Sequence, residues 1–105
     1  MIIRRGSTPY IVCKVVDMPF DYDSIKTAWI TINQNGKIVL DKVTEDIHIN
    51  HTNLALPLSQ EDTLALTAGI SGSIQVRLLN DSDIAYVSQQ EFTAVEDVNK
   101  DGVIA

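Results

Sequence analysis

Residues 26–41, KTAWITINQNGKIVLD, decide the fold of this chain. Ala28, Ile30 and Ile32 occupy every second position, which is the pattern of a β-strand with one buried face. The Asn35-Gly36 pair that follows suits the positive φ angles of a type I′ turn, and a second apolar run comes directly after it. The stretch therefore predicts a β-hairpin, and it carries no indication of chemistry.

Further short runs on both sides of this hairpin extend the pattern. Residues 8–16 predict a strand buried on much of both faces, which begins at a sheet edge because Pro9 has no N–H to donate. Two more hairpins are predicted at 47–58 and 73–91, and residues 92–98 continue the last strand through a bend. The Ser59-x-x-Asp62 capping pattern predicts a short helix at 60–66.

These elements together predict the fold class. About seven short strands with turn signals about every 8 to 12 residues are typical of an immunoglobulin-like antiparallel β-sandwich, here with one short helical turn. A small β-barrel is the alternative. A chain of 105 residues supports one domain, residues 1–105.

Composition and charge narrow the class of protein. The chain has no apolar run near the roughly 20 residues that a membrane span requires, so no membrane association is expected. Its first residues lack the features of a secretory signal, which predicts residence in the cytoplasm. A net charge of −6 repels phosphate backbones, so no nucleic-acid binding is expected.

The strongest local motif lies in residues 97–104, which match the first eight positions of a calcium-binding loop. Asp97, Asn99 and Asp101 supply oxygen ligands at positions 1, 3 and 5, and Gly102 stands at position 6. The acidic ligand of position 12 is missing, since Ala105 is position 9. The sequence therefore favours an acidic tail with a glycine turn over a calcium site.

Other potential ligands and catalytic groups are scattered. On a regular strand His48 and His51 would point to opposite faces, so they could not share a metal ion. The acid pairs Asp21/Asp23 and Asp81/Asp83 lie in turn sequences, where carboxylates are solvated. Residues 69–73, GISGS, lack the second glycine of a Gly-x-Ser-x-Gly nucleophile elbow and predict a loop before a strand. We expect no catalytic residues, no cofactor and no metal, and therefore no enzyme.

Four further residues have alternative interpretations. Cys13, the only cysteine, is predicted to be a small buried hydrophobe, with a reactive thiol as the alternative. Trp29 is predicted to be a core residue, and an outward orientation would instead indicate a contact surface. Arg4 and Arg5 are expected at a solvated chain end before the first strand, with a phosphate clasp as the alternative.

Several motifs spread over almost the whole chain resemble a group of small prophage-encoded proteins of gut Gram-positive bacteria. They are Arg5-Gly6-Ser7-Thr8-Pro9, Asn35-Gly36-Lys37, Leu58-Ser59-Gln60-Glu61-Asp62-Thr63-Leu64, Ile74-Gln75-Val76-Arg77 and the segment from Ala85 to Ser88. Ser7 and Ser59 depart mildly from the pattern of that group. Its members are similar in layout to the immunoglobulin-like N-terminal module of phage baseplate upper proteins.

The resemblance implies a non-enzymatic structural or adaptor protein of a phage tail or baseplate. Its expected partners are other phage virion proteins and further copies of itself, as a homo-oligomer. It would reside in the cytoplasm of the lysogenic host and then in the virion. The alternative is a small ligand-binding module that binds carbohydrate through Trp29 with Tyr22 or Tyr86, or calcium through the oxygens of Asp97, Asn99 and Asp101.

Overall fold

A computed structural model of the chain describes residues 2–92, 94–97 and 104. Within these residues, strands dominate and the helical elements are short. The elements in chain order are β1 (Ile2–Arg4), β2 (Tyr10–Cys13), the 3-10 turn η1 (Tyr22–Ser24), β3 (Ile25–Gln34), β4 (Lys37–Lys42), the 3-10 turn η2 (Thr44–Asp46), β5 (His48–Ile49), β6 (Leu54–Pro57), α1 (Gln60–Leu64), β7 (Gly72–Asn80), β8 (Ala85–Phe92) and β9 (Ala94–Glu96). None of the described helices is long and apolar enough to cross a membrane.

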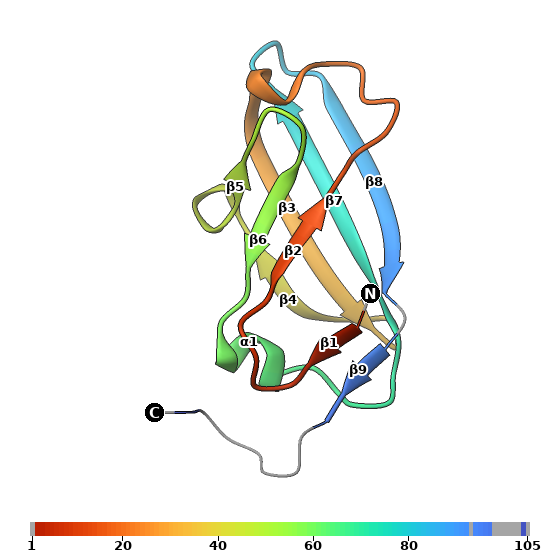
Figure 1. The fold of residues 1–105 in the computed structure, drawn as a ribbon. Helices are drawn as coiled ribbons and strands as arrows, with labels where there is room; N and C mark the ends of the chain where they lie inside the picture. Colours follow the sequence, from red (N-terminus) through yellow and green to blue (C-terminus); the bar gives the residue numbers. More distant parts are fainter. Residues whose placement is uncertain (1, 93, 98–103, 105) are drawn as a thin grey trace.

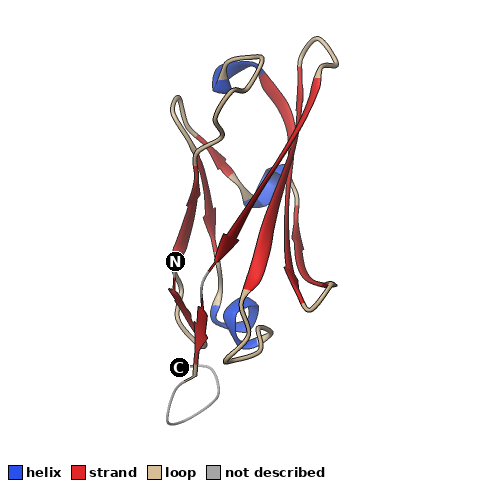
Figure 2. Ribbon diagram, turned by 90° about the vertical axis from the view of Figure 1, so that its right-hand side faces the viewer, coloured by secondary structure: helices blue, strands red, loops and turns tan. Residues whose placement is uncertain are grey.

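Two antiparallel sheets face each other across the core (Figures 1 and 2). One has the strand order β4-β3-β7-β8 and the other the order β2-β6-β5. This arrangement corresponds to the C′-C-F-G and B-E-D sheets of an immunoglobulin-like sandwich, which confirms the predicted fold class. The two terminal strands, β1 and β9, form a separate two-stranded sheet, in which they pair in parallel. The expectation of an antiparallel fold of about seven strands missed this pair.

The central hairpin forms as its sequence predicts. Gln34 pairs with Lys37 across the two-residue turn, and Asn35 and Gly36 have φ angles of 51° and 73°. These positive values fit a type I′ turn, which matches the twist of the flanking strands. The register shifts between Ile32 and Asn33, so the β3-β4 ladder carries one irregularity.

The core fills the space between the two sheets with aliphatic side chains. The fully buried residues from both sheets include Ile11, Ala28, Ile30, Ile32, Leu54, Leu56, Ile74 and Leu78. Cys13 is also buried, at 1% exposure, and burial raises the pKa of its thiol to about 11. The prediction of a small buried hydrophobe at Cys13 is therefore confirmed.

Strand β2 differs from its prediction in one respect. It is an edge strand, as Pro9 indicated, but only alternate residues are buried. Tyr10 and Val12 are 60% and 49% exposed on the outer face of the β2-β6-β5 sheet. Its β-branched and aromatic composition thus reflects strand propensity rather than burial on both faces.

The predicted helix and the other two hairpins are confirmed. Ser59 Oγ accepts a hydrogen bond from the Asp62 N–H, and the Asp62 carboxylate accepts one from the Ser59 N–H. This capping box starts α1, which ends at Leu64 rather than Leu66. The hairpins are β5-β6 and β7-β8.

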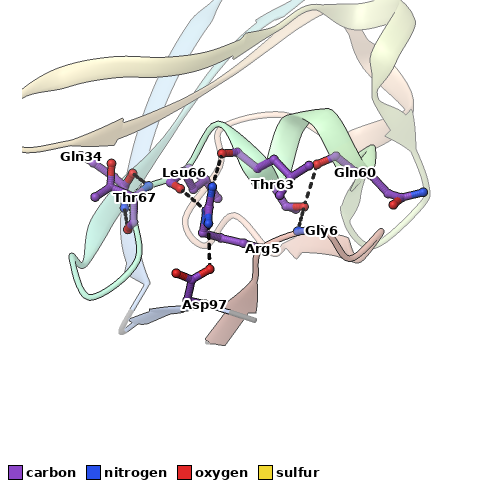
Figure 3. A network of polar contacts seen from close by, with 9 residues as sticks. Arg5, Gly6, Gln34, Gln60, Thr63, Leu66, Thr67 and Asp97 are labelled. Atoms are coloured by element: carbon purple, nitrogen blue, oxygen red, sulfur yellow. Dashed lines mark hydrogen bonds and ion pairs between the residues drawn. The ribbon is translucent and has the colours of Figure 1, made fainter. Parts of the chain in front are cut away.

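Arg5 joins the N-terminal segment to the rest of the fold (Figure 3). Its guanidinium donates hydrogen bonds to the carbonyl oxygens of Leu64 and Leu66 and pairs with the Asp97 carboxylate at 2.7 Å. The side chain of Arg5 is only 16% exposed. The expectation of a solvated chain end is therefore wrong for Arg5, whose donors satisfy the carbonyl oxygens of Leu64 at the end of α1 and of Leu66 just beyond it.

Candidate functional site

The outer face of the β4-β3-β7-β8 sheet carries an aromatic, a charged and an exposed aliphatic side chain next to one another. Residues of β3 alternate between the two faces, so Trp29 points away from the buried Ala28 and Ile30. Trp29 is half-buried by its neighbours on the outer face. The prediction that Trp29 belongs to the core is wrong, and the alternative of an outward aromatic residue describes the structure.

Three side chains form a row across this face. Trp29 on β3 lies opposite Arg77 on β7, and Arg77 lies opposite Val87 on β8. The Arg77 guanidinium carbon is 5.3 Å from the centroid of the Trp29 ring, which is the geometry of a cation–π contact. Val87 is 57% exposed beside this pair. We call Trp29, Arg77 and Val87 the outer-face row.

The row ends at the free edge of β8. This strand is the last in its sheet and is paired along its length with β7, with no register shift between Ala85 and Phe92. The Asn80 N–H bonds the Ile84 carbonyl oxygen at 3.0 Å, and hydrogen-bonded pairs alternate with non-bonded ones along an antiparallel ladder. It follows that Ala85, Val87, Gln89 and Glu91 direct their backbone N–H and C=O groups away from β7.

The other described sheet edges are shorter or less regular. Strand β4 has the bulge opposite Ile32 and Asn33 and carries Lys37, Asp41 and Lys42. Strands β2 and β5 have four and two residues. Charges, bulges and short length are the usual ways in which proteins prevent edge pairing. Strand β8 has none of them apart from the single charge of Glu91.

The aromatic residues of the predicted carbohydrate platform do not meet. Tyr86 pairs with the buried Leu78, so it lies on the inner side of β8, where its hydroxyl donates to the Val16 carbonyl oxygen at 2.9 Å. The Tyr22 hydroxyl accepts a hydrogen bond from the Val15 N–H. Neither tyrosine shares the outer face with Trp29, over which Arg77 already lies.

The two histidines lie in separate environments. His48 is on β5, with its ring centroid 6.0 Å from that of Tyr10. His51 lies in the β5-β6 turn rather than on a strand, and its Nδ1 is 2.7 Å from the Asp23 carboxylate. The prediction that the two histidines point to opposite faces assumed a regular strand, which does not describe His51, and its Asp23 partner was missed because Asp23 is distant in sequence.

The acidic groups are also dispersed. Asp21 precedes η1, whereas Asp23 within it contacts His51. Asp83 has a φ of 60° in the β7-β8 turn and lies 3.8 Å from the Lys26 ammonium. Among the described residues, no three His, Cys, Asp or Glu side chains come together as a metal site would require.

The calcium-like motif lies mostly outside the described residues, which include only Asp97 and Ile104 of it. The Asp97 carboxylate pairs with Arg5, as Figure 3 shows. Ile104 exchanges backbone hydrogen bonds with the Gln60 side-chain amide, beside α1. The first potential ligand of the motif therefore has a structural partner.

The segment 69–73 confirms the prediction of a loop before a strand. Gly69 has a φ of 79°, and β7 begins at Gly72. Gln34 holds this loop through its amide, which accepts from the Thr67 N–H at 2.8 Å and donates to the Thr67 and Ile70 carbonyl oxygens. Ser71 stands in a surface loop and not on a nucleophile elbow.

Comparison of the chain with protein-family models, with curated proteins and with solved structures finds no match.

Proposed function

We propose that this protein is a non-enzymatic structural or adaptor component of a phage tail or baseplate, which acts through contacts with other virion proteins and with copies of itself. The motif resemblance over residues 5–9, 35–37, 58–64, 74–77 and 85–88 supplies the phage context. On this proposal the protein is made in the cytoplasm of the lysogenic host and then enters the virion.

The observation that carries the proposal is the outer-face row beside the open edge of β8. Tryptophan and arginine are the residues most enriched at the energetic centres of protein interfaces. Here Trp29 and Arg77 are already packed against each other, so little side-chain entropy remains to be lost when a partner covers them. Val87 extends this surface with exposed apolar area. A preorganised, mixed aromatic and charged face of this kind suits a protein partner.

The proposal is tested by peptide mass spectrometry on purified particles after induction of the prophage in the source strain. The amount of this chain is normalised to that of the major tail protein. A fixed ratio of several copies per particle supports a structural role and limits the symmetry of the site it occupies. Presence in the lysate together with absence from particles overturns the proposal.

A further inference from the structure

We infer that β8 is the self-association edge of this protein: two copies pair antiparallel along Ala85–Phe92 about a two-fold axis and join their four-stranded sheets into one continuous sheet. This inference rests on the proposed function and deepens it, because it identifies a second copy of this chain as one partner of the same surface.

The β8 edge is open for pairing. Ala85, Val87, Gln89 and Glu91 present backbone donors and acceptors outward, and within the described part of the chain β8 pairs only with β7. The strand is long and regular, and it contains no proline, lysine or bulge. Such an edge pairs readily with another strand. In Figure 1 it runs along one side of the molecule, away from β4.

The β8 edge is also complementary to itself. An antiparallel pairing centred on Ser88 sets Ala85 opposite Glu91 of the second copy and Val87 opposite Gln89 of the second copy. Every outward-directed residue of one strand then meets an outward-directed residue of the other, so the ladder is complete. The two Glu91 carboxylates lie at opposite ends of the pair, which avoids the repulsion of like charges across strands. A two-fold axis relates the copies, as in most homodimers.

Pairing along β8 also makes the outer face continuous between the two copies. In this register the Val87 side chains of the two copies are diagonal neighbours at the centre of the interface, within reach of each other. Each lies beside Arg77 of its own copy, which in turn lies beside Trp29. Pairing therefore brings the two outer-face rows together and covers Val87, which is 57% exposed in the single chain.

The test compares two substitutions that add the same charge to opposite edges of one sheet. Val87→Lys places two lysines next to each other at the proposed axis, whereas Ile38→Lys changes a residue that is 66% exposed on β4. Light scattering across a concentration series should show dimers for the unmodified chain and for Ile38→Lys, and monomers for Val87→Lys. Gln89→Pro serves as a second edge variant, since it removes an outward N–H that the β7 ladder does not use.

A cysteine substitution tests the register. Ser88 faces Ser88 of the second copy as a non-hydrogen-bonded pair, at a Cα separation of about 4.5 Å that suits a disulfide. Ser88→Cys should therefore form a disulfide-linked dimer under mild oxidation, while the buried Cys13 of the unmodified chain should not.

Two results would overturn the inference. One is that the unmodified chain stays monomeric throughout the concentration series. The other is that Val87→Lys and Gln89→Pro both remain dimeric and Ser88→Cys forms no disulfide-linked dimer. These outcomes are separate from the fate of the proposed function. If the chain dimerises through β8 but is absent from particles, only the proposed virion role is rejected. If the chain is monomeric but present in particles, only the proposed self-pairing is rejected.

Discussion

The guanidinium carbon of Arg77 lies 5.3 Å from the centroid of the Trp29 ring, and the two residues face each other directly across strands β7 and β3. The contact is on the outside of the sandwich, where Trp29 has the buried Ala28 and Ile30 as chain neighbours on the opposite face. It fixes the orientation of a large aromatic side chain at the surface without placing that side chain in the core.

We predict that Arg77→Ala loosens this contact and increases the exposure of Trp29. The free energy of unfolding should fall by about 0.5–1 kcal/mol, the usual magnitude of an exposed cation–π pair. Trp29 is the only tryptophan, so its fluorescence reports the contact directly, and the emission maximum should move to longer wavelength. Arg4→Ala is the matched control, because Arg4 is exposed and pairs with Glu96. Equal spectra for Arg77→Ala and the unmodified chain would contradict the prediction.

Gln34 gives a prediction with a defined pH dependence. Its buried amide donates to the Thr67 and Ile70 carbonyl oxygens, so in Gln34→Glu a carboxylate would face two acceptors. The pKa of the introduced carboxyl should rise above its unfolded value, and the loss of stability should be largest at neutral pH, about 2 kcal/mol or more. Stability should recover as the pH falls and the carboxyl is protonated.

Urea unfolding at several pH values measures this effect. Asn35→Asp, at the exposed tip of the β3-β4 hairpin, makes the same amide-to-carboxylate change outside the loop that Gln34 contacts, and it should have little effect because aspartate also suits this turn position. A Gln34→Glu variant as stable as Asn35→Asp at pH 7 would show that the Gln34 amide does not hold the loop.

Gly72 is required by close packing. A Cβ atom at this position would lie 2.5 Å from Phe92 Cζ and would also overlap the Asn33 carbonyl oxygen. We expect Gly72→Ala to reduce the free energy of unfolding by about 3 kcal/mol, because backbone or core must move. Gly69→Ala has space for its methyl group but a φ of 79°, so its cost should be only about 1 kcal/mol. Thermal unfolding of both variants measures the two losses of stability. A Gly72→Ala variant that is more stable than Gly69→Ala would contradict the prediction.

The Asp62 carboxyl links stability to acidic pH. Burial acts to raise the pKa of Asp62, but hydrogen bonds from the Ser59 N–H and from Lys42 outweigh it, and the pKa is held below its ordinary value of 3.8. A group of this kind stabilises the fold fully above its unfolded pKa, and the contribution is lost as the pH falls through the lower folded pKa.

We therefore expect Asp62→Asn to lower the free energy of unfolding by about 1–2 kcal/mol at pH 7. The difference from the unmodified chain should shrink below about pH 4, the ordinary pKa of an aspartate, because the unfolded chain binds a proton there before the folded chain does. The exposed Glu61→Gln, one residue away on the same helix, is the control. A difference that stays constant down to acidic pH would contradict the assignment to Asp62.

The hairpins and the helix start were predictable from sequence because short-range rules determine them. Asn35-Gly36 fixes its own turn, and Ser59 with Asp62 forms a cap within four residues. The β1-β9 pair was not predictable in this way, since it joins residues at opposite ends of the chain. The same is true of the bonds of Arg5 to the α1 segment, which only the tertiary fold creates.

The candidate site was only partly predictable. Alternation placed Trp29 on the face opposite Ala28 and Ile30, but it could not show which face was buried. Because aromatic residues on the central strands of a sandwich usually lie in the core, a core position was expected for Trp29. Arg77 as its partner requires the register of β3 with β7. The free edge of β8 likewise depends on the strand order, which no local pattern encodes.

The central claim is that this protein works in the particle through the outer-face row and the β8 edge. Its most direct test is to count copies of the chain per particle, by peptide mass spectrometry, after induction of lysogens that encode the unmodified chain, Val87→Lys or Ile38→Lys. We expect a fixed ratio for the unmodified chain and for Ile38→Lys, and a strong reduction for Val87→Lys. Particles that lack the unmodified chain, or that hold Val87→Lys at the unmodified ratio, would contradict it.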